Sequence, residues 1–173
     1  MKWVSHIAIA ASVAAPISPS AVPVAALGAT APDWLEWVLQ FAGWRVKHRT
    51  VTHYLATWLL LAAFGAFLWD YRGWITWFAI GGVTHWVCDA LTIQGVPLGW
   101  WSDRRVHLFG GRLRTGSPAE FVIVAIAVAL SAVLTWNLRV DHGFVPFFYD
   151  WSGLYEQGII DGSEWRQNRF RFL

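Results

Sequence analysis

The chain has 173 residues, of which 56% are hydrophobic and only 14% are charged, and its formal net charge is +2. Soluble globular domains carry about 25% charged residues, so this composition favours a small integral membrane protein over a soluble enzyme. The single cysteine, Cys88, excludes both an internal disulfide and a zinc–thiolate cluster.

The N-terminal region contains two short apolar runs, Trp3–Ala15 and Val22–Ala31, separated by a proline-rich stretch. The first run would make a helix of about 20 Å, which is too short to cross a hydrocarbon core of about 30 Å. Prolines interrupt helices because they lack the backbone N–H group. We therefore predict a broken, re-entrant hairpin that is retained and not cleaved as a signal peptide.

Residues 33–43 predict a short amphipathic helix with an apolar face suited to a membrane interface. Three longer apolar segments follow, and they predict about three full membrane spans. We expect an all-α, integral membrane helical bundle over residues 1–138, followed by an aromatic tail over residues 139–173. The three segments are His53–Trp69, Trp74–Thr92 and Ala119–Leu138.

The basic residues are concentrated in two loops, 45–49 and 104–114, in which Asp103 is the only neighbouring acid. Because successive spans alternate in direction, both loops should lie on one side of the membrane, and an excess of basic residues marks the cytoplasmic side. Topology thus accounts for these residues without a nucleic-acid partner. They are Arg45, Lys47, Arg49, Arg104, Arg105, Arg112 and Arg114.

The pair His85 and Asp89 is the most informative feature of the apolar segments. A spacing of four residues places both side chains on one face of a helix. Ionisable groups are costly within a membrane, so they indicate a functional site, and imidazole with carboxylate is a donor set that zinc prefers. The alternative is a polar contact between two helices.

Four further residues could join this pair near the cytoplasmic side. His48 and His53 would diverge by about 140° on a regular helix, so they can share a pocket only if His48 lies in a loop; otherwise His48 is incidental. Asp33 is either a helix N-cap or a ligand. His6 is either a ligand or a hydrogen-bonding group between helices.

Glu120 lies in the segment Ser117-Pro118-Ala119-Glu120, which has the residues typical of a helix start. The structural interpretation of Glu120 is therefore the stronger one when it is judged from local sequence alone.

Several short motifs occur along the chain in an order that resembles the YdjM family of bacterial membrane-bound metal-dependent hydrolases, over about residues 4–136. An early histidine and a late Gly-x-x-x-Glu pattern complete the resemblance. The motifs are Ala31-Pro32-Asp33, His48-Arg49-Thr50-Val51-Thr52-His53, Thr84-His85-Trp86-Val87-Cys88-Asp89-Ala90-Leu91-Thr92 and Gly95-Val96-Pro97-Leu98, with His6 and Gly116–Glu120 at the two ends.

The family is distantly similar to zinc-dependent phospholipase C, and this similarity implies a cluster of divalent metal ions, most simply zinc. It implies one site made by Asp33, His48, His85 and Asp89. It also implies that His6 joins a second metal, with Asp89 as the bridge. The remaining candidates for catalysis are His53, as a further ligand or an acid–base group, Arg49 and Glu120.

Two positions depart from the family pattern. The usual step is Pro-Asp-x-Asp, but Leu35 stands where the second aspartate is expected, and Tyr54 replaces a common serine after the second histidine. The missing carboxylate weakens the case for a full multi-metal site.

The resemblance implies an enzyme of the bacterial inner membrane, with its site facing the cytoplasm and its C-terminus in the periplasm. We expect it to cleave a phosphoester or a lipid headgroup at the inner leaflet, with arginines of 104–114 binding the anionic headgroup. The alternative is a non-catalytic membrane subunit, with a structural or vestigial metal site, that binds a protein complex through residues 139–173. Ion transport is a weaker third interpretation.

Overall fold

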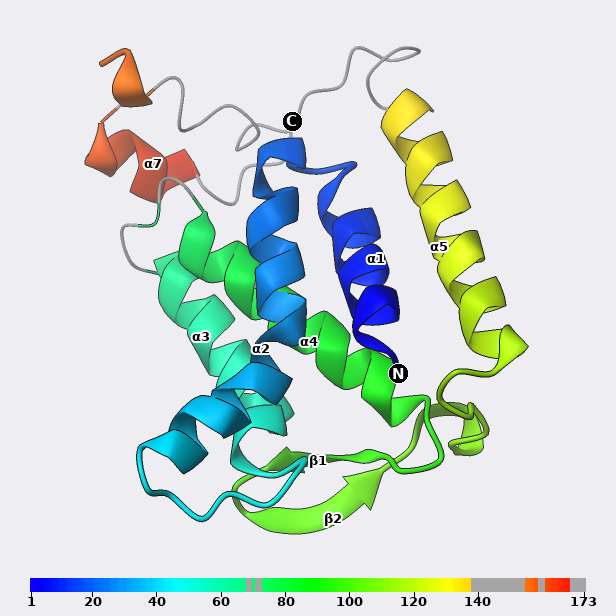
Figure 1. The fold of residues 1–173 in the computed structure, drawn as a ribbon. Coiled ribbons are helices and arrows are strands. Elements are labelled where there is room, and N and C mark those ends of the chain that lie inside the picture. The colour runs from blue at the N-terminus through cyan, green and yellow to red at the C-terminus, as the bar shows by residue number, and fades with distance from the viewer. Residues whose placement is uncertain (68–69, 71–72, 138–154, 159–160, 169–173) are drawn as a thin grey trace.

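The computed structural model describes residues 1–67, 70, 73–137, 155–158 and 161–168. Most of the described residues are helical, as predicted, although the structure also contains a two-stranded sheet (Figure 1). The α-helices are α1 (Trp3–Ala14), α2 (Val22–Phe41), α3 (Leu55–Phe67), α4 (Trp74–Ala90), α5 (Pro118–Trp136) and α7 (Gly162–Asn168). Short 3₁₀ helices cover Pro19–Ala21, Val51–His53 and Leu108–Gly110.

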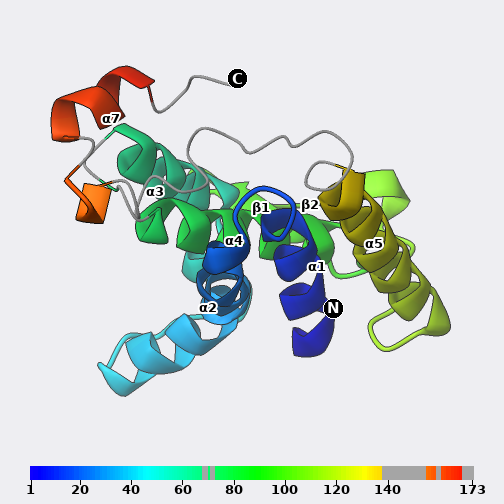
Figure 2. The same cartoon turned by 90° about the horizontal axis from the view of Figure 1, so that it is seen from above.

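The sequence analysis expected the apolar run Val22–Ala31 and the amphipathic helix over 33–43 as separate elements. This is wrong, because α2 runs through both as one helix of 20 residues from Val22 to Phe41, with Pro32 inside it. A proline in a helix removes one i to i−4 hydrogen bond, here the bond to the carbonyl of Gly28. Burial against α1 and α4 keeps the first half of α2 in place, since the two helices supply its densest packing. The second half projects outward from the other helices (Figure 2).

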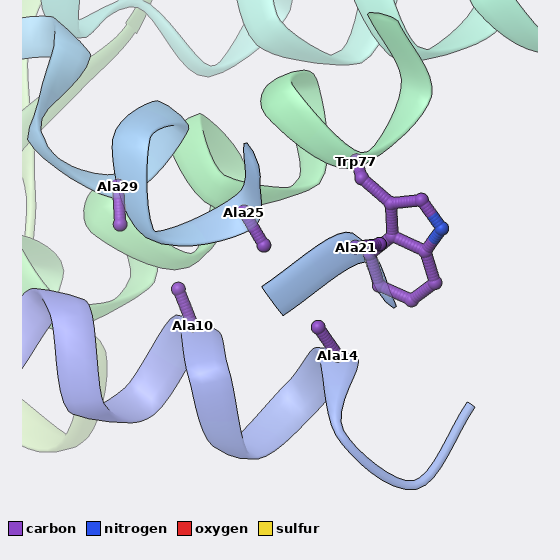
Figure 3. Close-up of a cluster of buried hydrophobic side chains, with 6 residues drawn as sticks. All are labelled: Ala10, Ala14, Ala21, Ala25, Ala29 and Trp77. Atoms are coloured by element: carbon purple, nitrogen blue, oxygen red, sulfur yellow. The ribbon is translucent and has the colours of Figure 1, made fainter. Parts of the chain in front are cut away.

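Small residues allow α1, α2 and α4 to approach one another closely. Five alanines from α1, α2 and the turn between them form a buried cluster with Trp77 of α4 (Figure 3). A Cβ atom added at Gly28 would collide with the backbone of Phe78, and one at Gly81 would collide with the carbonyl of Ala25. Glycines at a helix crossing permit such backbone contact, and here the crossing places α2 directly beside the histidine of α4.

The segment 95–118, predicted as a loop, contains a small antiparallel hairpin of β1 (Val96–Gly99) and β2 (Ser102–Val106). Its register pairs Val96 with Val106, and an irregularity follows Pro97. The prediction missed these strands because they are only four and five residues long and the second is polar. The hairpin lies below the helices in Figure 1.

Among the described residues, α5 is the one helix that is both long and apolar enough to cross a membrane. It covers 19 residues, and most of its side chains are exposed in the absence of lipid. The predicted spans at α3 and α4 have 13 and 17 helical residues, so the expectation of about three full spans remains a prediction. The predicted ends at Trp69 and Leu138, and most of the tail 139–173, lie outside the described residues.

Several elements converge near the end of α4. These are the start of α1, the second half of α2 and the loop before α3 (Figure 1). The guanidinium of Arg49, from the loop before α3, donates to the carbonyl of Gly95 beside the hairpin at 3.2 Å. The loop before α3 is therefore in direct contact with the residue that precedes β1.

Candidate metal centre

Most of the buried polar residues in the described part of the chain gather at this end. His85 and Asp89 lie on one face of α4 and are both fully buried. His6 of α1 and His53 of the 3₁₀ helix before α3 are also fully buried, while Asp33 of α2 is partly exposed. The prediction that His85 and Asp89 share one helix face is thus correct, and residues distant in sequence surround the pair.

The ring of His85 has a defined orientation. Its Nδ1 lies 2.7 Å from the carbonyl oxygen of Ala29. A carbonyl only accepts hydrogen bonds, so Nδ1 carries the proton, and in the neutral ring Nε2 keeps its lone pair. The α2–α4 crossing at Gly28 and Gly81 brings the Ala29 carbonyl to this position.

The ring of His53 is also fixed through contacts at its Nδ1. Its Nδ1 lies 3.0 Å from the hydroxyl of Thr52 and 3.1 Å from Oε1 of Glu36, which leaves Nε2 directed at Oδ1 of Asp33, 3.3 Å away. The Nε2 atoms of His53 and His85 are both buried without a hydrogen bond of acceptable geometry. Buried polar atoms are rarely left unpaired in native proteins, so two such atoms beside one carboxylate need an explanation.

The separations between donors suit a metal ion. Ligands about 2.0–2.1 Å from a tetrahedral ion lie about 3.3–3.4 Å from one another. His85 Nε2 lies 3.5 Å from Oδ2 of Asp89 and 4.0 Å from Oδ1 of Asp33, and His6 Nε2 lies 3.5 Å from Oδ1 of Asp89. Three groups of donors are close enough to hold an ion: His6 with His85 and Asp89, Asp33 with His53 and His85, and Glu36 with His48 and His53.

The two aspartates differ in how much of their charge is already compensated. Asp89 binds the N-terminal amine of Met1 at 2.7 Å and the guanidinium of Arg49 at 3.0 Å. Asp33 accepts one hydrogen bond from the indole of Trp3, at 2.6 Å to Oδ2. Since Oδ1 of Asp33 faces two lone-pair nitrogens and no cationic side chain bonds it, the group of Asp33, His53 and His85 is the best prepared for a cation.

Arg49 connects the centre to its surroundings. It is buried, and its guanidinium binds Asp89 and the hydroxyl of Thr92 as well as the Gly95 carbonyl. Its φ of 59° is uncommon for a residue other than glycine. Such a backbone costs about 1–3 kcal/mol unless the surroundings hold it, and three contacts of the side chain do so here.

His48 does not lie with His85 and Asp89, as the predicted four-residue site required. Its side chain is 63% exposed, and its Nδ1 lies 2.7 Å from Oε2 of Glu36. His53 occupies the position beside Asp33 and His85. The loop placement of His48, which the sequence analysis required if the two histidines were to share a pocket, is correct.

Glu36 is a site residue that the sequence analysis missed. It lies in the second half of α2, and it is almost fully buried. The pattern gave a usable signal, since a glutamate three residues after Asp33 shares its side of the helix.

Glu120 belongs to none of the three donor groups. Its carboxylate accepts hydrogen bonds from the backbone N–H groups of Lys2 and Gly116, at 2.8 and 2.7 Å, and from the hydroxyl of Ser5. These contacts join the start of α1 to the start of α5. Its catalytic role stays a prediction, whereas its contacts are those of a helix anchor.

The carboxylates of Asp33 and Glu36 lie 3.3 and 3.1 Å from the two ring nitrogens of His53, so their negative charge favours both a proton and a metal cation at this ring. Protons and cations therefore compete for the same nitrogen, since a metal binds only the unprotonated ring.

A cavity of about 360 Å³ opens onto some of the donors, and its lining includes His6, Asp33 and Asp89. Its walls come from the start of α1, from α2 and from the loop before α3, and they include Lys2, Trp37, His48 and Arg49. The cavity thus combines carboxylates and imidazoles with cationic side chains, a combination that suits an anionic substrate beside a metal.

A family model described as "YdjM inner membrane protein" matches residues 1–148, a range that includes all the residues of this centre. The match confirms the resemblance drawn from the short motifs. No curated protein and no solved structure matches the chain.

Proposed function

The chain belongs to the YdjM inner membrane protein family, and from this premise we propose that it is a metal-dependent hydrolase of the inner membrane. We propose a phosphoester as the substrate, with a lipid headgroup as its most natural source at a membrane surface. The observation that carries the proposal is the pair of buried Nε2 atoms, on His53 and His85, that face Asp33 without a hydrogen bond.

Asp33, His53 and His85 would hold the first divalent ion, with zinc the best fit to two imidazoles and a carboxylate. His6 and Asp89 form a neighbouring donor group with His85, which belongs to both groups. When bound, the ion would supply Lewis acidity toward a phosphoryl or acyl oxygen and toward water.

The chain's own residues would bind and orient the substrate. Arg49 lines the cavity, and its planar guanidinium suits a phosphate oxygen. Lys2 adds a second positive charge at the cavity mouth. Burial of the imidazoles would keep bulk water away from the donors, which strengthens every charge interaction there.

We also propose the finer topology expected from the sequence. The α3, α4 and α5 segments would cross the membrane, the cavity would open to the cytoplasm, and the C-terminus would lie in the periplasm. The arrangement follows from the concentration of basic residues in the loops 45–49 and 104–114. A reporter fused after Leu173 should be active only in the periplasm; activity in the cytoplasm would reverse this orientation.

The proposal is tested by measuring metal content and hydrolysis with one preparation. Detergent-purified protein should contain a divalent metal and should cleave a phosphodiester chromogen or phospholipid vesicles in a chelator-sensitive manner. The variant Arg49→Met should retain its metal and lose activity. Metal-loaded protein that is inert toward both substrates, yet co-purifies with a membrane complex through residues 139–173, would support the non-catalytic subunit instead.

A further inference from the structure

We propose that Glu36 is a positioning residue, whose carboxylate sets the tautomer of His53 so that Nε2 and not Nδ1 faces the metal. This inference rests on the proposed function only for its metal-binding part, because the tautomer of His53 is a property of the metal-free protein as well.

Glu36 organises the loop that carries His53. Its Oε1 accepts from the backbone N–H of Arg49 at 2.8 Å and from the hydroxyl of Thr52 at 3.3 Å, and it faces Nδ1 of His53. Its Oε2 faces Nδ1 of His48. One buried carboxylate thus contacts four residues of the segment 48–53, and no other described side chain contacts so many of them.

The donor groups around His53 exclude one another. An ion held by Glu36, His48 and His53 would need Nδ1 of His53, whereas an ion beside Asp33 needs Nε2. A neutral imidazole offers one lone pair, so it serves only one of these sites. The ring nitrogen that carries the proton therefore decides which of the two candidate sites can bind a metal.

Three observations favour the Nε2 site. Nδ1 of His53 is already partnered by the Glu36 carboxylate and by the Thr52 hydroxyl, which itself donates to Glu36 and can therefore only accept from Nδ1. Nε2, in contrast, is buried without a hydrogen bond. The largely exposed His48 would be a loosely held ligand. A metal-binding histidine usually donates its other N–H to a carboxylate or carbonyl, which fixes the ring. Glu36 supplies this partner for His53, as the Ala29 carbonyl does for His85.

This role also accounts for the departure at Leu35. The family pattern expects a second aspartate at that position, and the chain has a buried glutamate one residue later. The longer side chain of Glu36 reaches the 48–53 segment from the next position on α2. A second carboxylate is thus present at the centre, in contact with His53 and not with His85.

The first experiment measures the NMR chemical shifts of the ring nitrogens of His53. It uses metal-free protein labelled with ¹⁵N-histidine, at a pH where the ring is neutral. Wild-type protein should show the proton on Nδ1, and Glu36→Gln should shift the population toward the other tautomer. A proton on Nε2 in the wild type would overturn the proposal. This readout holds even for a protein that takes up no metal, so it separates failure of this inference from failure of the proposed function.

The second experiment compares zinc affinity across four proteins, with zinc binding competed by a chromophoric chelator. Affinity should fall about 10- to 100-fold in Glu36→Gln and recover in part in Glu36→Asp, which keeps the carboxylate. It should remain within about twofold of wild type in the control Glu164→Gln on α7, and likewise in His48→Ala. Equal affinity of Glu36→Gln and wild type would overturn the positioning role. A loss in His48→Ala as large as that in Glu36→Gln would make Glu36 a ligand.

Discussion

Two buried polar clusters lie at the two sides of α1, and they differ in how fully their hydrogen bonds are satisfied. Around Glu120, three donors from Lys2, Ser5 and Gly116 meet one carboxylate. Around Asp33, two imidazole nitrogens are directed at a carboxylate oxygen without forming a hydrogen bond. Both clusters are polar and buried, and both join helices.

The difference separates a structural cluster from a candidate binding site. A satisfied cluster gains stability from charge-assisted hydrogen bonds. A cluster with unpaired buried nitrogens pays a desolvation cost that no described protein group offsets, and a cation between the donors would offset it. Residue type alone does not make this distinction, because both clusters contain a carboxylate that the sequence analysis had singled out.

The largest expected effect is on metal binding. His85→Ala should abolish retention of a divalent metal, because His85 belongs to both donor groups on the Nε2 side. His107→Ala is the matched control, since His107 is exposed and belongs to no donor group. Elemental analysis of the purified variants measures the effect. Equal metal content in the two variants would show that the cluster around Asp33 is not a metal site.

The next effect concerns the satisfied cluster. Glu120→Gln should lower the free energy of unfolding by about 1.5–3 kcal/mol, the usual worth of hydrogen bonds to a charged group. Metal content should not change. Thermal unfolding in detergent, with elemental analysis of the same sample, checks both points. A variant of unchanged stability that loses hydrolytic activity would instead favour the catalytic role predicted for Glu120.

A smaller effect is expected at the partner of Asp33. Trp3→Phe removes the indole N–H that binds Oδ2 of Asp33 but keeps an aromatic ring to pack on Trp37. Zinc affinity should fall about tenfold, because partners of ligating carboxylates orient them. Trp37→Phe serves as the control in the same chelator competition. An equal loss in both variants would attribute the effect to packing.

The smallest effect is expected at Ser5. Its hydroxyl donates to Glu120, and Ser5→Ala should cost about 1 kcal/mol of stability without altering metal affinity. The adjacent His6 makes this variant informative, because the two side chains follow one another on α1 but belong to different clusters. A change in metal affinity as large as that of Trp3→Phe would show that the clusters are coupled.

Local sequence patterns predicted much of this arrangement. The four-residue spacing of His85 and Asp89 placed both on one helix face, and the mismatch between His48 and His53 required a loop between them. Both inferences depend only on helix geometry. The helical class followed from apolar segments of sufficient length.

Tertiary packing decided what the sequence patterns did not reveal. The segments 22–31 and 33–43 were predicted as separate elements, but packing of α2 on α4 at Gly28 keeps the helix continuous through Pro32. Continuity of α2 then places Asp33 and Glu36 on successive turns beside the 48–53 segment. The role of Glu36 depends on this long-range contact, and so does the exchange of His53 for His48 at the centre.

The most direct test of the account is X-ray absorption at the zinc edge of zinc-loaded, detergent-purified wild-type protein. Asp33, His53 and His85 should appear as at least two imidazole nitrogens and a carboxylate oxygen at about 2.0–2.2 Å. Folded protein that retains no zinc after supplementation, or zinc bound without imidazole, would contradict the claim that the unpaired nitrogens form a metal site.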